Sequence, residues 1–295
     1  MTRSTVRHVS GLAVAGLALT GAIGVTATTT AAPAAAAANS IRVITHNVAK
    51  KPSALGGAIR KADATDGPEF VLLQEVCSSM VKRLQDDLGY TTFRQRRDAD
   101  KCGDGEWVGE ATVWTGSGAR AVDPVSLNTT PIDGHTYGLA CLDVSRNGRD
   151  IRACSTHLIA EKANPRERNA LTTTMKGVLA GFVAAKDVVI VGGDFNTTPK
   201  TFPMDNLYGV GQDHQGQFRE LHQMATGRPG RGGKATVGGG DKARKIDYVF
   251  ASTKGTRSSG GTEKTCWKDG NPSTTDCTTS NHRILWGDVP LEPVG

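Results

Sequence analysis

The sequence predicts a layered α/β sandwich with mixed β-sheets, formed by one domain. Short apolar runs typical of strands alternate with longer amphipathic runs typical of helices, which indicates sheets covered by helices. Two neighbouring runs are joined by a tight hairpin signal, so the sheets cannot be purely parallel. Setting aside the first 38 of the 295 residues leaves 257, a length that suits one large α/β domain.

The first 38 residues have the pattern of a secretory signal peptide. Arg3 and Arg7 precede an apolar run, and a tract of small residues ending at Ala38 follows. The apolar run is too short and too rich in glycine to span a bilayer well, and no later run is apolar enough for a membrane helix. We therefore expect residues 39–295 to be a secreted, extracellular domain that is monomeric and does not insert stably into membranes.

Eight runs are predicted to be strands because they are short and rich in Val, Ile, Leu and Thr. The second of them is continuously apolar, which indicates a strand buried on both faces. In chain order the runs are residues 41–48, 69–76, 110–116, 135–144, 151–159, 188–193, 245–252 and 284–289.

Two runs have helical periodicity. Residues 78–89 place three apolar side chains on one face, and Gly89 ends the helix. The second helix is predicted to begin at Asn164, with a proline in its first turn and a glutamate three residues after the cap. Apolar residues between Leu171 and Phe182 then line one face.

The hairpin signal also predicts a disulfide. Asn147-Gly148 favours a type I′ turn, and a turn centred there places Cys141 opposite Cys154. The pair falls at a non-hydrogen-bonded site, where the Cα atoms of antiparallel strands approach most closely.

Six cysteines in the exported part predict three disulfides and an oxidising compartment. A bridge from Cys266 to Cys277 would close a short loop, and a bridge from Cys77 to Cys102 then follows by elimination. The cysteine and histidine spacings do not indicate a zinc site.

The charge of the chain is mildly basic. The sequence has 35 Lys and Arg against 29 Asp and Glu, and removal of the signal leaves 33 basic residues and a formal charge of +4. This charge fits either simple solubility or a polyanion-binding face. Basic clusters at residues 94–101 and 228–245 favour the second, and Arg244 and Lys245 are the best placed to meet a polyanion. Aromatic residues are only 5% of the chain, too few for the stacking platforms of single-strand binders.

Polar side chains that could carry chemistry stand where strands end or begin. Burying such a group without partners costs ~2–7 kcal/mol, so the set is expected to converge on a polar site. Taken singly, each is more often a turn residue, a cap or a structural histidine. The set comprises Asn47, Glu75, His157, Asp194, Asn196, Asp247, Asn281 and His282.

In chain order these residues resemble the motifs of the endonuclease/exonuclease/phosphatase superfamily, which has the deoxyribonuclease-I-like fold. The segments "GGDFN" and "IDYVF" are the most specific, "LQE" and "STHL" are less so, and "THN" is weak. The resemblance runs from Asn47 to His282. It implies a four-layer α/β/β/α sandwich with two mixed sheets and metal-dependent hydrolysis of phosphate esters.

Phosphodiester cleavage needs charge neutralisation, an aligned water molecule and a proton for the leaving group. Hard oxygen ligands suit a divalent ion, for which we expect Mg²⁺ ahead of Mn²⁺ or Ca²⁺. Glu75 is the best candidate ligand, with Asn47 beside it and Asn281 as a third member.

The remaining residues are candidates for the acid/base and phosphate-binding roles. We expect Asp194 to orient or deprotonate the water and Asn196 to hold the phosphate. The resemblance further implies that Asp247 orients His282, which raises the basicity of the imidazole. It also implies that His157 contacts the phosphate from the other side, as acid or electrophile.

One position departs from the family pattern. Where the family usually has Ser-Asp-His, this chain has Ser280-Asn281-His282. An amide cannot supply the charge of the missing carboxylate, which puts a second metal site in doubt.

Other polar residues are given structural interpretations. His46 precedes Asn47 on a strand and should face the opposite side. His135, His214 and His222 match no motif, and residues 167–169 are expected to form a solvated helix face.

The leading hypothesis is a secreted nuclease that acts on DNA or RNA. The first alternative is a phospholipid phosphodiesterase of sphingomyelinase type, or a phosphomonoesterase. A membrane-acting enzyme needs exposed apolar or aromatic hairpins, and the sequence shows no such cluster. The other alternative, a noncatalytic binding protein, is disfavoured by the intact Glu75, Asp194 and His282.

Overall fold

The computed structural model describes most of the chain after the predicted signal peptide. The predicted signal peptide, the helix cap Asn164, His214 and Cys277 lie outside the described residues. The described ranges are residues 39–64, 69–96, 102–103, 105–132, 134–160, 165–209, 216–266 and 280–294.

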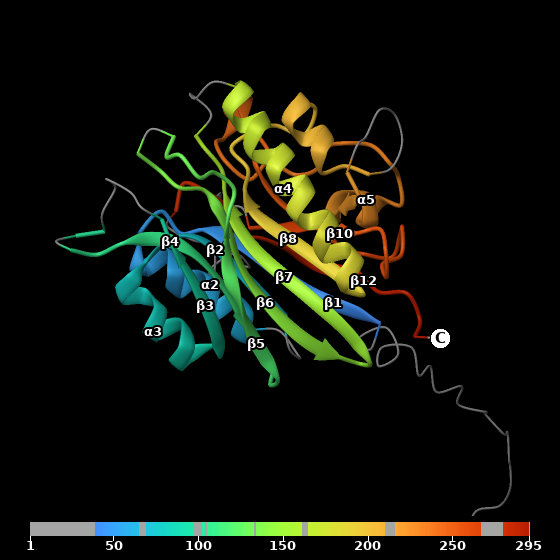
Figure 1. The fold of residues 1–295 in the computed structure, drawn as a ribbon, viewed down its shortest axis with the longest axis horizontal. Coiled ribbons are helices and arrows are strands. Elements are labelled where there is room, and N and C mark those ends of the chain that lie inside the picture. Colours follow the sequence, from blue (N-terminus) through green and yellow to red (C-terminus); the bar gives the residue numbers. More distant parts are fainter. Residues whose placement is uncertain are drawn as a thin grey trace, which may run out of the picture. The chain divides into compact units, whose positions relative to one another are not determined.

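Two six-stranded mixed sheets form the centre of the fold (Figure 1). The first has the order β11 (Lys264–Thr265), β12 (Leu285–Pro290), β1 (Ser40–Asn47), β2 (Glu69–Cys77), β4 (Val108–Trp114), β3 (Tyr90–Gln95). The second has the order β5 (Ala119–Ser126), β6 (Gly138–Arg146), β7 (Arg149–His157), β8 (Val188–Asp194), β10 (Asp247–Ser252), β9 (Phe218–Glu220). The pairs β1–β2 and β7–β8 are parallel, and the other paired strands are antiparallel.

Helices cover the outer faces of both sheets. The helices α2 (Pro52–Asp63) and α3 (Ser78–Asp87) pack on the first sheet, and α4 (Pro165–Ala185) with the 3₁₀ helix η1 (Phe202–Asn206) packs on the second. Figure 1 shows α3 and α4 on opposite sides of the strands. The short helix α5 (Leu221–Thr226) packs near β9, β10 and β12, and η2 (Gly240–Lys242) is a single 3₁₀ turn. The predicted four-layer α/β/β/α sandwich is confirmed.

Three hydrophobic cores separate the four layers, and strand β2 shows why. Its residues Phe70 and Leu72 point into the core between the sheets, whereas Val71 and Leu73 point into the core under α2 and α3. Side chains alternate across a strand, so a strand buried on both faces must be continuously apolar. Full burial stabilises each such side chain by about 1.5–3 kcal/mol.

The hairpin predicted around Asn147-Gly148 is confirmed. Both residues have positive φ, 51° and 73°, as a type I′ turn requires. Cys141 pairs with Cys154 across β6 and β7, and the two form a disulfide with their Cα atoms 4.1 Å apart.

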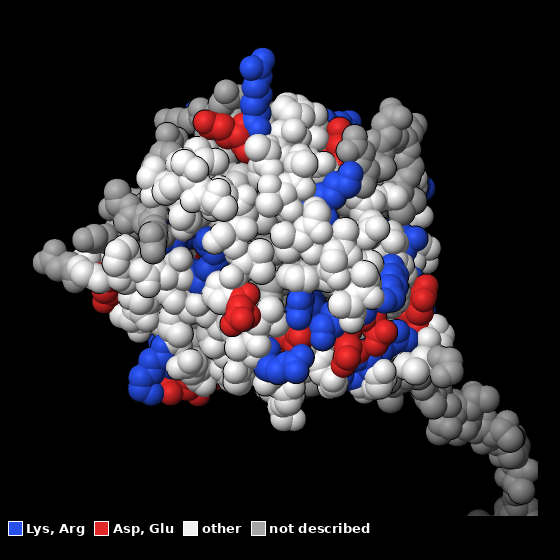
Figure 2. Space-filling view, viewed as in Figure 1, with Lys and Arg blue, Asp and Glu red and all other residues white. Residues whose placement is uncertain are grey.

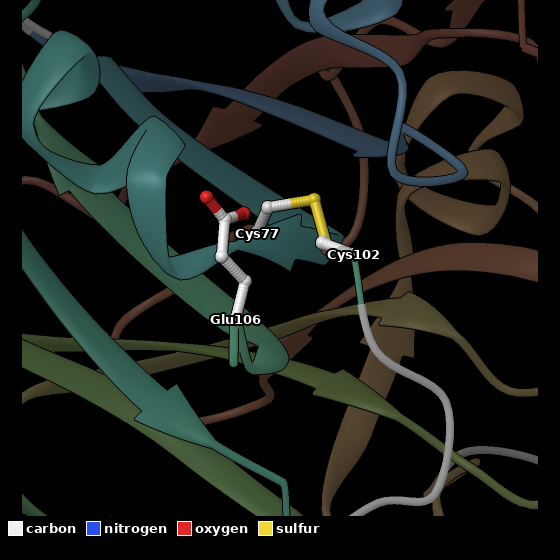
Figure 3. Close-up of side chains that lie close together, drawn as sticks. All are labelled: Cys77, Cys102 and Glu106. Atoms are coloured by element: carbon white, nitrogen blue, oxygen red, sulfur yellow. A yellow bond between two sulfur atoms is a disulfide. The ribbon is translucent and has the colours of Figure 1, made fainter. Parts of the chain in front are cut away.

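The bridge from Cys77 to Cys102 is also confirmed. Figure 3 shows the acidic side chain of Glu106 beside this bridge. The three residues have the spacing of a metal cluster, but both sulfurs are used in the disulfide, so they do not offer thiolate ligands. Cys266 is disulfide-bonded, and its predicted partner lies outside the described residues.

All eight predicted strands and both predicted helices are present. The helices α2 and α5 and the strands β3, β5, β9 and β11 were not predicted from the sequence. Strand β5 has a mostly exposed pattern at a sheet edge, so it lacks the apolar run by which strands are recognised. Within the described residues, no helix is long and apolar enough to cross a membrane.

Candidate active site

The predicted polar residues, with the exception of Asn281, converge where the central strands of both sheets end. Asn47 ends β1, and Glu75 lies near the end of the parallel neighbour β2. In the second sheet, Asp194 ends β8 between His157 of the parallel strand β7 and Asp247 of the antiparallel strand β10. Because β10 runs opposite to β8, its first residue lies beside the last residue of β8.

Asn47 joins the two sheets at this point. Its Nδ2 donates hydrogen bonds to Oε1 of Glu75 at 3.0 Å and to Oδ2 of Asp194 at 3.1 Å. Its Oδ1 accepts the backbone N–H of Ala49 at 2.9 Å. Two carboxylates from different sheets are therefore held against one amide.

Unusual backbone conformations aim two of the site residues. Glu75 and Asn196 both have φ of 51°, a left-handed conformation that is rare for residues other than glycine. Glu75 lies in a bulge of β2, which displaces its side chain from the normal alternation of the strand. Strain of this kind is concentrated at functional sites.

Gly193 is required by the backbone immediately before Asp194. It has φ of 148°, and a Cβ atom there would lie 1.9 Å from the carbonyl oxygen of Thr156. Strand β7 therefore approaches closely enough to place His157 beside Asp194 only because residue 193 has no side chain.

Asp247 and His282 form a buried pair. Nδ1 of His282 lies 3.0 and 3.1 Å from the two carboxylate oxygens of Asp247, and its Nε2 lies 3.6 Å from Oδ2 of Asp194. Burial lowers the pKa of His282, but the charges of Asp247 and Asp194 outweigh it and raise that pKa to about 10. His282 is therefore an imidazolium at neutral pH.

Neighbouring hydroxyl groups fix this pair. The backbone N–H of Asp247 donates to Oγ1 of Thr236 at 3.0 Å. The backbone N–H of His282 donates to Oγ of Ser280, which itself donates to the carbonyl oxygen of Asn47 at 2.7 Å. The backbones of both Asp247 and His282 are thus held in place by hydrogen bonds to neighbouring side chains.

Asp194 is held in an environment that disfavours its charge. Burial and the nearby Asp247 carboxylate raise the pKa of Asp194 to about 7, although His282 and the hydrogen bond from Asn47 oppose the change. A proton or a cation at this position would offset the excess negative charge.

The donor set fits a hard divalent cation. Ligand atoms of Asp194, Asp247 and His282 lie within 4.8 Å of one another. His282 is an imidazolium paired with Asp247, which leaves the carboxylates of Asp194 and Glu75 as the better ligands. Asn47 presents its amide nitrogen to both carboxylates, so its amide would have to turn over to offer oxygen.

His157 and Asn196 face the site from the other side. Nδ2 of Asn196 lies 2.9 Å from Nε2 of His157 and donates to the carbonyl oxygen of Leu158 at 2.9 Å. Burial, and then the charge of Arg96, hold the pKa of His157 well below its usual value. A neutral imidazole whose Nε2 accepts from an amide suits a positioning contact better than the role of acid.

A cleft of about 220 Å³ opens above these groups. Asn47 and Asp247 lie buried beneath it, whereas Asn281 is exposed and is not part of its lining. The lining comprises Glu75, Arg96, His135, Tyr137, His157, Leu158, Ala160, Asp194, Asn196 and His282.

Five lining residues were not predicted as site residues, and three of them have polar side chains: Arg96, His135 and Tyr137. In the sequence, Arg96 belongs to a basic run, His135 matches no motif, and Tyr137 lies within a predicted strand. The segment that carries His135 and Tyr137 is fixed by Asn128, which donates to the carbonyl of His135 and accepts the N–H of Tyr137. No local sequence signal marks such residues, because only the fold brings this segment to the cleft.

The described members of the two basic clusters divide between the surface and the interior: Arg228, Lys234, Lys242 and Arg244 are exposed, whereas Arg94, Arg96 and Lys245 are buried. Arg94 and Arg96 are 4% and 6% exposed and share the buried carboxylate of Glu110. Lys245, predicted to meet a polyanion, is instead buried. Its Nζ forms ion pairs with Glu220 and Glu263.

His46 and His222 have the structural surroundings that were expected, whereas His135 lines the cleft and the helix face at residues 167–169 is not fully solvated. His46 is fully buried, and burial followed by the charge of His282 lowers its pKa to about 3. His222 lies 2.8 Å from a carboxylate oxygen of Glu263. Arg168, expected on a solvated face, is buried and donates to the carbonyl oxygens of Ile159 and Ala160.

Comparisons with known proteins agree with this geometry. Residues 44–282 match the model of the Endonuclease/Exonuclease/phosphatase family. No curated protein matches the chain.

Solved structures share the fold at low identity. Truncated Caenorhabditis elegans TDP2 is 15% identical with a TM-score of 0.60, and the match covers 85% of this chain and 98% of that one. An endonuclease/exonuclease/phosphatase from Bacteroides vulgatus is 14% identical with a TM-score of 0.61, over 86% of this chain and 99% of that one. The human Nocturnin catalytic domain with bound sulfate is 17% identical with a TM-score of 0.62, over 86% and 95%.

Proposed function

This chain belongs to the endonuclease/exonuclease/phosphatase family, whose members are divalent-metal-dependent phosphodiester hydrolases, and on that premise we propose that it is a secreted nuclease. Its substrates in this proposal are the phosphodiester bonds of DNA or RNA. The signal-like first 38 residues and the cysteine-rich exported part support secretion.

The observation that carries the proposal is the position of His282 between Asp247 and Asp194. Its Nδ1 is held by Asp247, and its Nε2 faces Oδ2 of Asp194 at 3.6 Å. The carboxylate of Asp194 lines the cleft, where Asn47 and the backbone N–H of Asn196 hold it in a position from which it can accept a proton from a water molecule. We assign water activation to Asp194 and stabilisation of the phosphate charge to the His282 imidazolium.

His157 and Asn196 complete the site in this proposal. Asn196 holds the imidazole of His157 through its amide, and its own backbone N–H donates to Oδ1 of Asp194 at 2.9 Å. A shift of either residue would therefore disturb the carboxylate that activates water.

Glu75 and Asp194, with Asn47 beside them, would hold the divalent ion. We propose Mg²⁺ ahead of Mn²⁺ or Ca²⁺, because the donors are few, hard and mostly carboxylate. When bound, the ion would neutralise charge on the phosphoryl oxygens. The exposed Asn281 supplies no carboxylate, which favours a single ion.

Surface composition favours nucleic acid over phospholipid. The large apolar side chains that are exposed in the described residues lie on separate elements rather than in one patch: Tyr90, Trp107, Phe202 and Val294. An enzyme that enters a lipid interface needs such side chains together. On the face shown in Figure 2, basic and acidic side chains are intermixed, so we do not place the polyanion on that face.

The decisive experiment compares substrates. Purified protein comprising residues 39–295 is incubated with plasmid DNA, RNA, sphingomyelin vesicles and p-nitrophenyl phosphate, each with EDTA or with Mg²⁺, Mn²⁺ or Ca²⁺. The matched control is Asp247→Asn. We expect metal-dependent cleavage of a nucleic acid that is lost in the control. Preferential hydrolysis of sphingomyelin would instead indicate a phospholipid phosphodiesterase, and preferential hydrolysis of the monoester would indicate a phosphomonoesterase.

A further inference from the structure

Arg96 places a guanidinium in the wall of the active-site cleft, immediately after the end of β3. It is one of the lining residues together with Glu75 and His157, yet it is only 6% exposed. A buried arginine that borders a cleft has lost most of its water and keeps its charge, because arginine is always protonated in proteins. Such a group interacts strongly with any anion that enters.

Glu110 on β4 holds Arg96 in place. Nε of Arg96 lies 3.4 Å from one carboxylate oxygen of Glu110, and Nη1 of Arg94 lies 3.3 Å from the other. Glu110 is completely buried. Two guanidinium groups thus share one carboxylate, and the trio has a net positive charge.

The two arginines differ in what they can reach. Arg94 also donates to the carbonyl oxygen of Thr136 at 3.2 Å, and it does not line the cleft. Gly138 leaves room for its side chain, since a Cβ atom there would lie 2.3 Å from Nε of Arg94. Arg94 is therefore a packing and ion-pairing group, whereas Arg96 meets the cleft.

The charge of Arg96 acts electrostatically on the polar groups of the cleft. After burial, it is the largest cause of the low pKa of His157. The cleft already contains the carboxylates of Glu75 and Asp194, which repel an anionic substrate. A planar guanidinium can offset this repulsion and bind two phosphate oxygens at once.

We propose that Arg96, oriented by Glu110, is a substrate-binding residue that contacts the phosphate group in the cleft. This inference rests on the proposed function only for the identity of the substrate as a phosphodiester. The binding step itself requires a phosphate anion and no reaction.

The kinetic experiment uses bis(p-nitrophenyl) phosphate, a small diester that needs no wider surface. Arg96→Gln is compared with Arg94→Gln, a matched control that has the same ion-pair partner and similar burial but lies outside the cleft. Arg96→Gln would remove charge-assisted hydrogen bonds to the phosphate. We therefore expect kcat/KM to fall roughly 10- to 100-fold, mainly because KM rises. Arg94→Gln should retain kcat/KM at temperatures where it is folded.

Because removing one member of a buried ion pair can prevent folding, the pair Arg96→Lys and Arg94→Lys is measured as well. Lysine keeps the charge beside Glu110 but loses the planar fork. Arg96→Lys should again raise KM, and Arg94→Lys should not.

A binding experiment separates this inference from the proposed function. Thermal unfolding is followed with and without inorganic phosphate, which stabilises any folded protein that binds it. Phosphate should raise the Tm of the wild type and of the Arg94 variants, and this increase should be lost in Arg96→Gln and reduced in Arg96→Lys. A wild type that responds to phosphate but cleaves no diester would refute the proposed function and leave this inference standing.

Three results would overturn the role of Arg96. The first is an unchanged KM and phosphate response in the folded Arg96 variants. The second is an equal loss in the Arg94 and Arg96 variants, which would show a common structural effect. The third is the absence of any phosphate stabilisation in the wild type.

Discussion

Replacing Asp194 by asparagine should have opposite effects on stability and on activity. The substitution keeps the shape of the side chain and removes its charge. It also replaces one of two acceptor oxygens by a donor, so either the N–H of Asn196 or the amide of Asn47 loses its partner. Removing the buried charge therefore stabilises the metal-free variant, whereas losing the hydrogen bond destabilises it.

The two contributions can be compared from the structure. The pKa of Asp194 is raised from 3.8 to about 7, which at ~1.36 kcal/mol per pKa unit costs the metal-free fold roughly 4 kcal/mol once the carboxyl group is ionised. An unsatisfied buried partner costs about 1–3 kcal/mol. A raised pKa favours the fold below pH 3.8 and disfavours it progressively as the pH increases to 7. Without metal, Asp194→Asn should therefore be less stable than the wild type at pH 4 and more stable by ~1–3 kcal/mol at pH 8.

Urea unfolding in EDTA at pH 4, 6 and 8 measures this reversal. Asp123→Asn, which changes an exposed residue of β5, is the control and should leave stability almost unchanged. Added Mg²⁺ should stabilise the wild type at pH 8 but not Asp194→Asn, and the variant should lose ~10²–10⁴-fold in hydrolysis. The reasoning is refuted if Asp194→Asn is the less stable protein at pH 8, or if the difference does not depend on pH.

The remaining predictions concern four other positions. His282→Ala should reduce hydrolysis by ~10²–10⁴-fold with a folded circular dichroism spectrum; near-normal turnover would exclude it from the site. Because the pKa of His282 is raised from 6.5 to about 10, its contribution to stability is complete below pH 6.5 and is lost as the pH rises through 10. The unfolding free energy of the wild type should fall across this interval and that of His282→Gln should fall less, and equal slopes would contradict the raised pKa. Replacing both Cys141 and Cys154 by alanine should lower the free energy of unfolding by about 3 kcal/mol, measured by thermal unfolding. A decrease smaller than that caused by deleting one methyl group from the core would argue against the bridge. Asn281→Asp would add a carboxylate next to His282 and should change which ion supports turnover, as measured by metal titrations across a pH series; unchanged titrations would show that this position takes no part in ion binding.

The candidate site residues could be recognised from the sequence because the signal that marks them is local and does not depend on the order of the strands in the sheets. A polar residue at the end of an apolar strand is anomalous wherever the strand lies, and this signal found Asn47, Asp194 and Asp247. The hairpin register was predictable for a similar reason. The turn at Asn147-Gly148 is local, and it determines every pair across β6 and β7.

Residues whose role depends on distant partners were not predictable. Arg96 appears in the sequence as part of a basic run, and its burial follows from Glu110 on another strand. Lys245 is buried for the same reason, by Glu220 and Glu263. A cation can be internal only where the fold brings a carboxylate to it, and the spacing along the chain does not contain that information.

The position of β12 has a consequence for biosynthesis. This strand is synthesised last among the described strands, yet it pairs directly with β1, the first. Ser280, just before β12, is tied to the carbonyl of Asn47 and precedes His282. A ribosome-bound chain, or any chain truncated before Ser280, therefore lacks both the neighbour of its first strand and the imidazolium of its active site. The site that depends on His282 can therefore be completed only after almost the whole chain has been synthesised.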